Sequence, residues 1–285
     1  MQLSSDEIDQ VDQLLDAVEA ADGDRPDFRN LAAPHPDQTF LLAEDQVLVG
    51  LAQLTGDGAD WALRLTVHPE HRGPGSTVMA DLIDRAVAMA RQRGGGQFHL
   101  WVSAPGDEQD QLAARYGLSE RRDLYQMRIP LPVGVPWELT TRPFRPGVDE
   151  AAWLRVNNRA FSWHPEQGGW DTQTVKAHEA EEWFDPEGFL LHEQDGQLAG
   201  FCWTKIHIRP RPPLGEIYVI AVDPDFQGTG LGRKLVLAGL DHLASKGLTI
   251  GMLYVDAVNT PAVQLYLKMG FTIHHVDRAY TGPVT

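Results

Sequence analysis

Hydrophobic residues recur with two different periods along the chain. Some segments repeat them at helical spacing, and others place them in short β-branched or aromatic runs typical of buried strands. We predict helices at 5–20, 78–91, 109–116, 149–161 and 172–183, and another that starts at Leu231. We predict strands at 39–43, 47–54, 61–67, 97–102, 124–129, 137–145, 189–193, 198–208 and 217–222. Ser4 or Ser5 is expected to cap the first helix, and Asp149 the fourth.

The stretch 215–233 joins a strand, a glycine-rich loop and a helix. The strand ends at a turn formed by Asp223 and Pro224, and the loop contains glycines at 228, 230 and 232. The helix begins directly after the loop, so backbone N–H groups are left free at its N-terminus. These groups carry a partial positive charge that favours a phosphate. The pattern therefore predicts a pyrophosphate-binding loop.

The same pattern occurs a second time, earlier in the chain. At a constant offset of 155 residues (222 minus 67), Val67, Pro69, Arg72, Gly73 and Gly75 align with Val222, Pro224, Gln227, Gly228 and Gly230. The sequence is therefore an internal duplication. The proline-rich segment 130–136 reads as a stiff linker between the copies. We predict an N-terminal domain at 1–134 and a C-terminal domain at 135–285.

The order of strand, Val-x-Pro turn, Gln-Gly-x-Gly-x-Gly loop and helix resembles the acetyl-CoA-binding motif of the GNAT superfamily of N-acetyltransferases. A glycine-rich loop alone would also suit a dinucleotide, but the acidic residue expected about 20 positions further on is not obvious. A second block, from Asn259 through Tyr266 to Gly270 and Phe271, resembles the later cofactor helix of that superfamily. The resemblance implies an α/β fold, with an α+β mixed sheet, built as two tandem GNAT domains that use acetyl-CoA.

Composition narrows the function further. The 285 residues carry a formal net charge of −16, which opposes binding to nucleic acid or to an anionic membrane. No apolar run is long enough to span a bilayer, and the acidic N-terminus does not resemble a signal peptide. We therefore expect a cytoplasmic protein. The single cysteine, Cys202, excludes an intramolecular disulfide and is expected in the core.

The two copies differ in the residues that could perform acetyl transfer. Glu216 enters the strand before the loop, where a carboxylate could take a proton from an amine, and Tyr266 could protonate the leaving thiolate. The alternatives are a surface ion pair for Glu216 and a packed aromatic ring for Tyr266. The corresponding residues of the first copy are Trp61 and Ala113, neither of which can do this chemistry. The first copy is therefore expected to be catalytically degenerate.

A closer resemblance covers essentially the whole chain. Residues 157–170, 183–186, 203–205, 215–219 and 253–256 resemble the mycothiol synthases, a family of tandem GNAT enzymes. The resemblance implies acetyl transfer to the cysteine amine of desacetylmycothiol, a small thiol-sugar amine. It implies that the substrate is bound by Glu166, Lys205, Glu216 and Tyr254, with Asp27 as a candidate for a further acidic contact. No nucleic-acid or membrane partner is expected, and the chain is expected to be a monomer.

The same resemblance implies two acetyl-CoA sites. The catalytic site would be formed by Ile220, Ala221, Val222, Gln227, Gly228, Thr229, Gly230, Leu231, Gly232, Arg233, Asn259, Thr260, Pro261, Ala262, Val263 and Gln264. The second site would be formed by Leu65, Thr66, Val67, Arg72, Gly73, Pro74, Gly75, Ser76 and Thr77. Pro74 has no N–H to donate, and Thr77 stands where the second copy has Gly232, so the sequence predicts weaker phosphate binding in the first copy.

Three other interpretations stay open at this point. The acceptor could be another amine, such as an aminoglycoside or a peptide N-terminus. Alternatively, the chain could be a non-catalytic tandem module that binds CoA as a sensor or scaffold, although such a module would not need Glu216 and Tyr266. The histidines suggest a metal site, but His207, His274 and His275 lie in strand-like segments with no partner carboxylate at ligand spacing. We therefore expect no metal.

Overall fold

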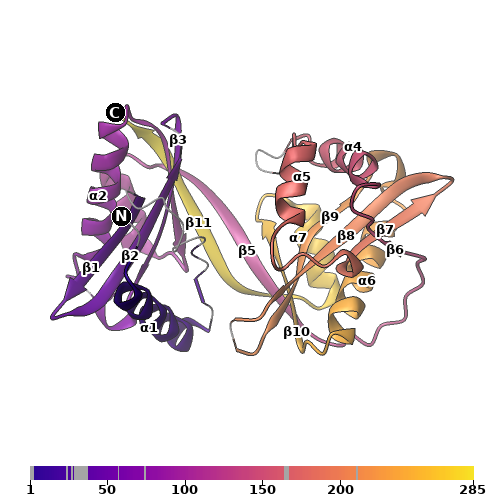
Figure 1. Ribbon diagram of the computed structural model, residues 1–285, viewed down its shortest axis with the longest axis horizontal. Helices are drawn as coiled ribbons and strands as arrows, with labels where there is room; N and C mark the ends of the chain where they lie inside the picture. The colour runs from indigo at the N-terminus through magenta and orange to yellow at the C-terminus, as the bar shows by residue number, and fades with distance from the viewer. Residues whose placement is uncertain are drawn as a thin grey trace. The chain divides into compact units, whose positions relative to one another are not determined.

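The computed structural model describes residues 3–23, 25–26, 28, 38–56, 58–73, 75–163, 167–209 and 211–285. Contacts divide the chain into two compact units (Figure 1). Unit 1 consists of residues 1–125, 256–258 and 275–285, and unit 2 of residues 126–255 and 259–274. These units are defined by packing, whereas the boundary at residue 134 separates the two sequence copies and stays a prediction.

Unit 1 is a mixed sheet covered by helices. Its elements are α1 (Ser5–Asp22), β1 (Thr39–Glu44), β2 (Val47–Gly56), β3 (Asp60–Val67), η2 (Pro69–His71), α2 (Val78–Gln92), β4 (Gly96–Ser103), α3 (Asp107–Arg115) and the first part of β5 (Glu120–Pro130). Strands β1, β2 and β3 pair antiparallel, and β3 pairs parallel with β4. Ser4 caps α1 and exchanges hydrogen bonds with Glu7, which confirms the predicted start of this helix.

The elements of unit 2 repeat this order from the first of three antiparallel strands onward, after a longer N-terminal part. They are the rest of β5, β6 (Arg142–Pro143), α4 (Glu150–Ala160), α5 (Thr172–Glu179), η3 (Pro186–Gly188), β7 (Phe189–Gln194), β8 (Gln197–His207), β9 (Leu214–Val222), η4 (Pro224–Phe226), α6 (Leu231–Ser245), β10 (Ile250–Asp256) and α7 (Thr260–Met269). Strands β6 to β9 pair antiparallel, and β9 pairs parallel with β10. A helix joins each parallel pair, since α2 follows β3 and α6 follows β9.

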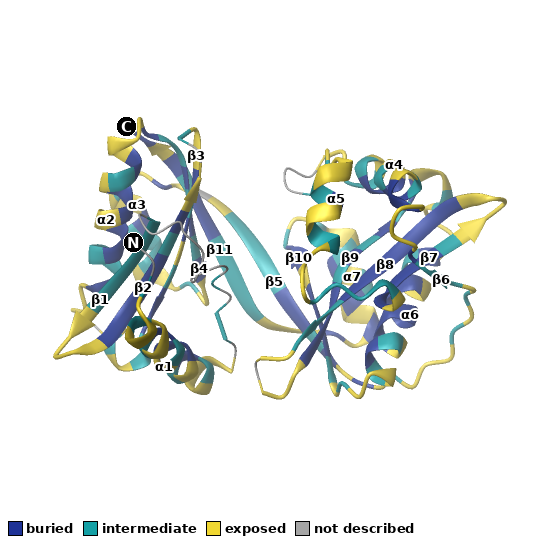
Figure 2. Cartoon of the chain, in the orientation of Figure 1, coloured by how far each residue is buried: buried dark blue, intermediate teal, exposed yellow. Residues whose placement is uncertain are grey.

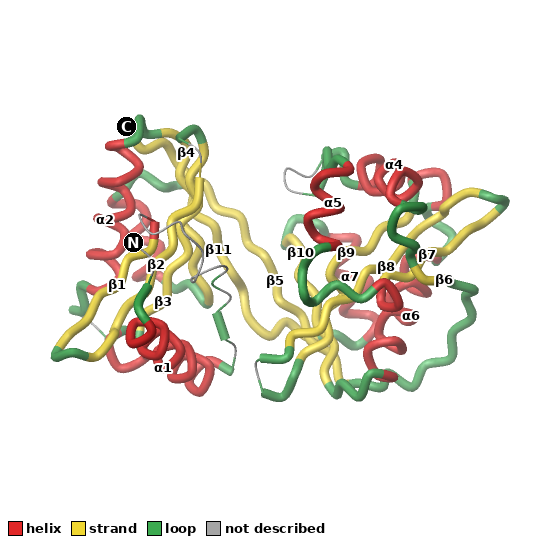
Figure 3. Tube along the Cα trace, viewed as in Figure 1, coloured by secondary structure: helices red, strands yellow, loops and turns green. Residues whose placement is uncertain are grey.

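The last strand of the chain returns to unit 1. Strand β11 (Thr272–Val284) pairs antiparallel with β4, with Asp277 opposite Ser103 and Val284 opposite Gly96. In Figure 3, β11 extends from the end of α7 to the C-terminus beside the strands of unit 1. The sheet of unit 1 is therefore completed by a segment that follows both sequence copies of the cofactor loop.

Matching hydrogen bonds show that the two copies share their local structure. The side chain of Arg72 donates to the Val67 carbonyl, and Gln227 donates to the Val222 carbonyl. The side chains at the preceding turns, His68 and Asp223, each accept from the backbone two residues further on. These pairs obey the same offset as the sequence alignment. The duplication inferred from the sequence is therefore present in the fold.

The sheet of unit 2 has two different faces. Residues at 201 and 203 of β8 pack with Trp153 of α4 in an aromatic core. Residues at 200, 202 and 204 face α6, because a methyl group on Gly239 would lie 2.5 Å from the Cys202 sulfur and 3.4 Å from Thr204. Figure 2 shows most of β8 in dark blue. Cys202 is fully buried there, as predicted.

Three predicted features differ from the structure. The strand expected at 137–145 is reduced to two paired residues, β6, of which Pro143 has no backbone donor. Asp149 precedes α4 but makes no capping hydrogen bond. Its carboxylate instead accepts from the guanidinium groups of Arg142 and Arg145. Helix α5 ends at Glu179, short of the predicted Trp183.

Candidate active site

The predicted pyrophosphate loop has the geometry of an anion site. Gly228 and Gly230 adopt φ angles of +77° and +79°, which side-chain-bearing residues rarely adopt. Gly230 occupies the N-cap position of α6 and supplies no side-chain acceptor, and the first turn of α6 contains no acidic residue. The amides at the start of α6 therefore remain available to a phosphate. This arrangement fits the pyrophosphate of acetyl-CoA.

Strands β9 and β10 pair over only a short length, at the start of β9. Gly215 pairs with Gly251 and Glu216 with Met252, whereas the equivalent strands β3 and β4 pair from Asp60 to Arg64. On its other side β9 bulges, because the register with β8 shifts between the partners Ile217 and Val219. The backbone of β9 beyond Glu216 is therefore not bonded to β10. The residue between these two partners, Tyr218, forms the bulge.

Glu216 lies where this pairing ends. Its side chain is 8% exposed, and its Oε2 lies 2.7 Å from Nε2 of His207, at the end of β8. Lys205 is directly opposite Glu216 in the β8–β9 register, so the side chains of both residues project to the same face. His207, which was considered only as a metal ligand, therefore has a carboxylate partner on the adjacent strand. His275 also has one, Asp277 at 3.5 Å.

Lys205 is held by aromatic rings on that face. Its ammonium nitrogen lies 4.7 Å from the ring centre of Trp183 and 5.5 Å from that of Tyr218. These two rings also contact each other edge to face, with centroids 5.0 Å apart. Cation–π attraction therefore orients Lys205 beside Glu216. The face that carries Glu216 combines a buried carboxylate, a fixed ammonium group and an aromatic wall.

Tyr266 lies on the inward face of α7. It is 7% exposed, and its ring lies 5.7 Å from that of Phe271. Burial, together with the nearby Cys202 thiol, raises the pKa of Tyr266 well above its usual value. The phenol therefore keeps its proton at neutral pH. The same hydrogen bond closes the helix in both copies, from Phe271 N to Tyr266 O and from Leu118 N to Ala113 O, which supports the alignment of Tyr266 with Ala113.

The remaining predicted residues lie at α7 and β10. Asn259 caps α7 by accepting from the Ala262 amide, so the predicted cofactor block 259–264 forms the first turn of a helix. Tyr254 on β10 is 38% exposed, and its hydroxyl accepts from Gln126. Asp27, Pro74 and Glu166 lie outside the described residues. The binding roles of all these residues stay predictions.

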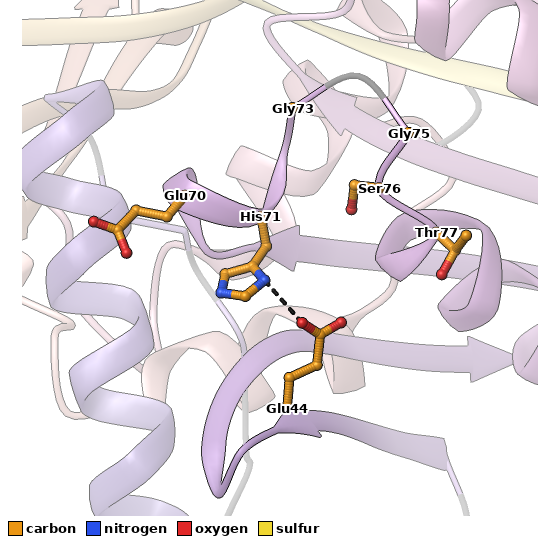
Figure 4. Close-up of a pocket in the computed structure, with 7 residues that line it drawn as sticks. All are labelled: Glu44, Glu70, His71, Gly73, Gly75, Ser76 and Thr77. Atoms are coloured by element: carbon orange, nitrogen blue, oxygen red, sulfur yellow. Dashed lines mark ion pairs between the residues drawn. The ribbon is translucent and has the colours of Figure 1, made fainter.

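The loop of the first copy has a different electrostatic character (Figure 4). Gly75 retains a left-handed φ of +89°, but carboxylates line the hollow beside the loop, and His71 pairs with Glu44 at 3.1 Å. Arg72, which could meet a phosphate, instead contacts both carboxylate oxygens of Asp22. The hollow is lined by Glu44, Glu70, His71, Gly73, Gly75, Ser76 and Thr77. These features are less favourable to an anion than those of the second copy.

Three successive residues of α4 fix two loops of unit 2. Asn157 donates to the Gln167 carbonyl, and Asn158 bonds both the N–H and the carbonyl of Trp170. Arg159 binds Asp223 and Asp225 at the turn before the pyrophosphate loop. The role of Arg159 was not found from the sequence, and His207 was considered only as a metal ligand, because each side chain acts through a partner on another element.

Comparisons with known proteins agree with this geometry. Residues 153–271 match the Acetyltransferase (GNAT) family. The fold resembles that of a GCN5-related N-acetyltransferase from Sphaerobacter thermophilus, with a TM-score of 0.78, 22% identity and coverage of 96% of this chain and 92% of that one. It also resembles a tandem GNAT protein from the clavulanic acid pathway, with a TM-score of 0.68, 18% identity and coverage of 99% and 97%. The chain is an acetyltransferase with two tandem GNAT domains.

Relatives with similar sequences assign the chain to a narrower family. The mycothiol acetyltransferase of Thermomonospora curvata is 43% identical over 99% of this chain and 95% of its own length. That of Nocardia farcinica is 40% identical over 98% and 95%. This chain belongs to the mycothiol acetyltransferase family.

Two further observations concern what the chain could bind. No helix in the described ranges is both long and apolar enough to cross a membrane. Within those same ranges, no group of three or more His, Cys, Asp or Glu side chains is placed to hold a metal ion. The expectation that no metal takes part stays a prediction.

Proposed function

We propose that this protein transfers an acetyl group from acetyl-CoA to the cysteine amine of desacetylmycothiol, which yields mycothiol. The observation that carries the proposal is the buried Glu216, which lies beside Lys205 where β9 parts from β10, on the strand that leads to the cofactor loop. The names of the full-length relatives support the choice of acceptor. We propose that the protein acts as a monomer in the cytoplasm.

Acetyl-CoA would supply the acetyl thioester and would be held by the loop 227–233, by 220–222 of β9 and by 259–264 of α7. Glu216 would take a proton from the substrate ammonium. An α-amino group has a pKa of about 8, against about 10.4 for lysine, so a modest base suffices. Backbone N–H groups of β9 beyond the bulge at Tyr218 would orient the acetyl carbonyl. Tyr266, which burial keeps protonated, would give its proton to the sulfur.

The acceptor would lie on the aromatic face. Sugar and inositol hydroxyls need polar partners, and Lys205 and Tyr254 would provide them, with Glu166 and Asp27 as further predicted contacts. The ammonium of Lys205 has three donors, and its position between Trp183 and Tyr218 would direct them toward hydroxyl oxygens.

The loop of the first copy would form the second, weaker acetyl-CoA site, at 65–67 and 72–77. Gly75 keeps the conformation of the anion loop there, but Glu44 and Glu70 line the hollow and oppose a pyrophosphate. Calorimetric titration with CoA should therefore reveal one tight site and one weak site. Replacement of Glu44 and Glu70 by glutamine should tighten only the weak one, and an unchanged weak site would contradict this electrostatic account.

The decisive experiment measures acetyl transfer to desacetylmycothiol beside an aminoglycoside and a peptide with a free N-terminus. We expect desacetylmycothiol to have the highest kcat/KM, and Glu216→Gln to lower that value by roughly 10² or more, because proton transfer is lost. Preference for another amine would overturn the acceptor. If the wild type transferred acetyl to none of the amines, the sensor or scaffold function would replace the enzymatic one.

A further inference from the structure

The contact between His207 and Glu216 has a chemical consequence, provided that Glu216 is the base proposed above. The two side chains lie 2.7 Å apart, Nε2 to Oε2, and they come from adjacent strands. Glu216 is 8% exposed and His207 is 23% exposed. The imidazole therefore lies between a nearly enclosed carboxylate and the solvent.

Acetylation of an ammonium group leaves one proton over. In the overall reaction, R–NH₃⁺ and CH₃CO–SCoA give R–NH–COCH₃, HS–CoA and H⁺. A C–N bond forms, the C–S bond breaks, and the nitrogen loses two protons. One of these protons replaces the proton that Tyr266 gives to the sulfur. The other is taken by Glu216 and must reach the solvent before the next turnover, although the carboxylate itself is almost fully buried.

We propose that His207 carries this proton from Glu216 to the solvent. In its Nδ1–H tautomer the neutral imidazole accepts the proton at Nε2 and releases the Nδ1 proton to water, which leaves Nε2–H facing the charged Glu216. Proton exchange with water returns the ring to the Nδ1–H tautomer before the next transfer. Glu216 thereby returns to its charged, basic form after each turnover. His207 does not need to touch the substrate and acts only through Glu216.

The other charged groups around the pair are poorly suited to this role. Lys205 is opposite Glu216, but its ammonium only donates hydrogen bonds and is directed over Trp183 and Tyr218. Arg209 and Arg211 follow His207 in the loop, and a guanidinium group does not give up its proton in proteins.

Neither β10 nor α4, which also pack on β9, supplies an alternative. The β10 residue in register with Glu216 is Met252, which carries no charge. Helix α4 directs Arg159 to Asp223 and Asp225. Of the charged and titratable groups named here, the one in hydrogen-bond contact with Glu216 is His207.

The test compares His207→Gln with His207→Ala in rapid-quench assays of acetyl transfer to desacetylmycothiol. Glutamine can still donate a hydrogen bond to Glu216 but cannot relay a proton. We expect His207→Gln to form the first equivalent of product at near the wild-type rate and then to turn over roughly 10²-fold more slowly. A pH indicator should show proton release lagging behind product. Added imidazole should accelerate steady-state turnover of His207→Ala.

Several outcomes would overturn the proposal. If His207→Gln matched the wild type in steady state, His207 would be only a hydrogen-bond donor. If the first turnover slowed as much as later ones, with no rescue by imidazole, its role would be structural. The matched control is His192→Gln on the neighbouring strand, where the ring contacts the Thr140 carbonyl, and it should change neither phase. Equal thermal melting of all variants would show that they fold.

Failure of this proposal can be told from failure of the proposed function. Should the wild type prefer another amine, the acceptor assignment fails, and the same burst and rescue measurements are made with that amine. If Glu216→Gln retained a fast first turnover, Glu216 would not be the base, and proton transfer from Glu216 through His207 would be excluded as well.

Discussion

Arg159 on α4 holds the carboxylate of Asp223 at 3.0 Å, and its second terminal nitrogen holds Asp225 at 3.0 Å. Asp223 is 3% exposed and forms the turn that leads from β9 into the cofactor loop. Since Asn157 and Asn158 secure the 167–170 segment from the same helix, α4 links that segment to the cofactor loop.

Removing Arg159 should weaken the binding of acetyl-CoA. Arg159→Ala leaves Asp223 buried without its cation, and hydrogen bonds to charged groups contribute about 1.5–3 kcal/mol. Arg159 is partly exposed, so we expect the lower end of that range, a loss of affinity of about tenfold in calorimetric titration. Arg155→Ala, an exposed position on the same helix, is the control and should bind normally. Equal affinities of the two variants would contradict this role of Arg159.

Substitutions of two glycines in the cofactor loop should distinguish an effect on stability from an effect on acetyl-CoA binding. Gly230→Ala places a side chain at a φ of +79°, which should lower the free energy of unfolding by about 1–2 kcal/mol. In Gly232→Ala the new methyl group would lie 3.7 Å from Val222, an ordinary contact, so thermal stability should be unchanged. Acetyl-CoA affinity should fall in both variants. If Gly232→Ala bound acetyl-CoA normally, close approach of a phosphate to this residue would be excluded.

Tyr266→Phe should slow turnover about 10²-fold without changing acetyl-CoA affinity, because only the proton donor is lost. Burial raises the pKa of Tyr266 above its usual value of about 10, so the wild type should keep this proton up to pH 10. The wild-type kcat should therefore show no decline between pH 8 and 10 that is absent from the variant. A defect confined to affinity would count against Tyr266 as the acid.

Asp149 should stabilise unit 2 only above acidic pH. Burial alone would raise the pKa of Asp149, but hydrogen bonds from Arg145 and Arg142 outweigh it and lower the pKa well below the usual range. The stabilisation is therefore complete above the unfolded value of about 3.9 and is lost as the pH falls below it. Asp149→Asn should cost about 1–3 kcal/mol at pH 7 and progressively less below pH 4, measured by urea unfolding.

The control for this prediction is Asp241→Asn, an exposed position on α6. This variant should leave the free energy of unfolding unchanged at both pH 7 and pH 2. A difference between Asp149→Asn and the wild type that persisted undiminished at pH 2 would contradict the assignment of this pH dependence to Asp149.

Local signals made much of the fold predictable. The glycine loop, the start of α6 at Leu231 and the cap at Ser4 depend on residues within a few positions of one another. The constant offset between copies aligned Pro69 with Pro224, and each of these prolines begins a short 3-10 helix, η2 and η4. The strand expected at 137–145 was an exception, because only Arg142 and Pro143 are paired.

Side-chain contacts were less predictable than backbone elements. His207 is nine residues from Glu216, and Arg159 is 64 residues from Asp223. Hydrophobic periodicity assigns a residue to a face of a strand or helix, but not to a partner on another element. Asp149 shows the same limit, since its position suggested a helix cap and two arginines bind its carboxylate instead.

The route of β11 also has a consequence for biosynthesis. The ribosome synthesises the chain from its N-terminus, so β4 is made long before its partner β11. Thr281 of β11, for example, contacts His99 of β4 at a separation of 182 residues. Until then β4 presents an unsatisfied edge to other chains in the cell. Nascent unit 1 should therefore be the part of this protein that depends most on chaperones.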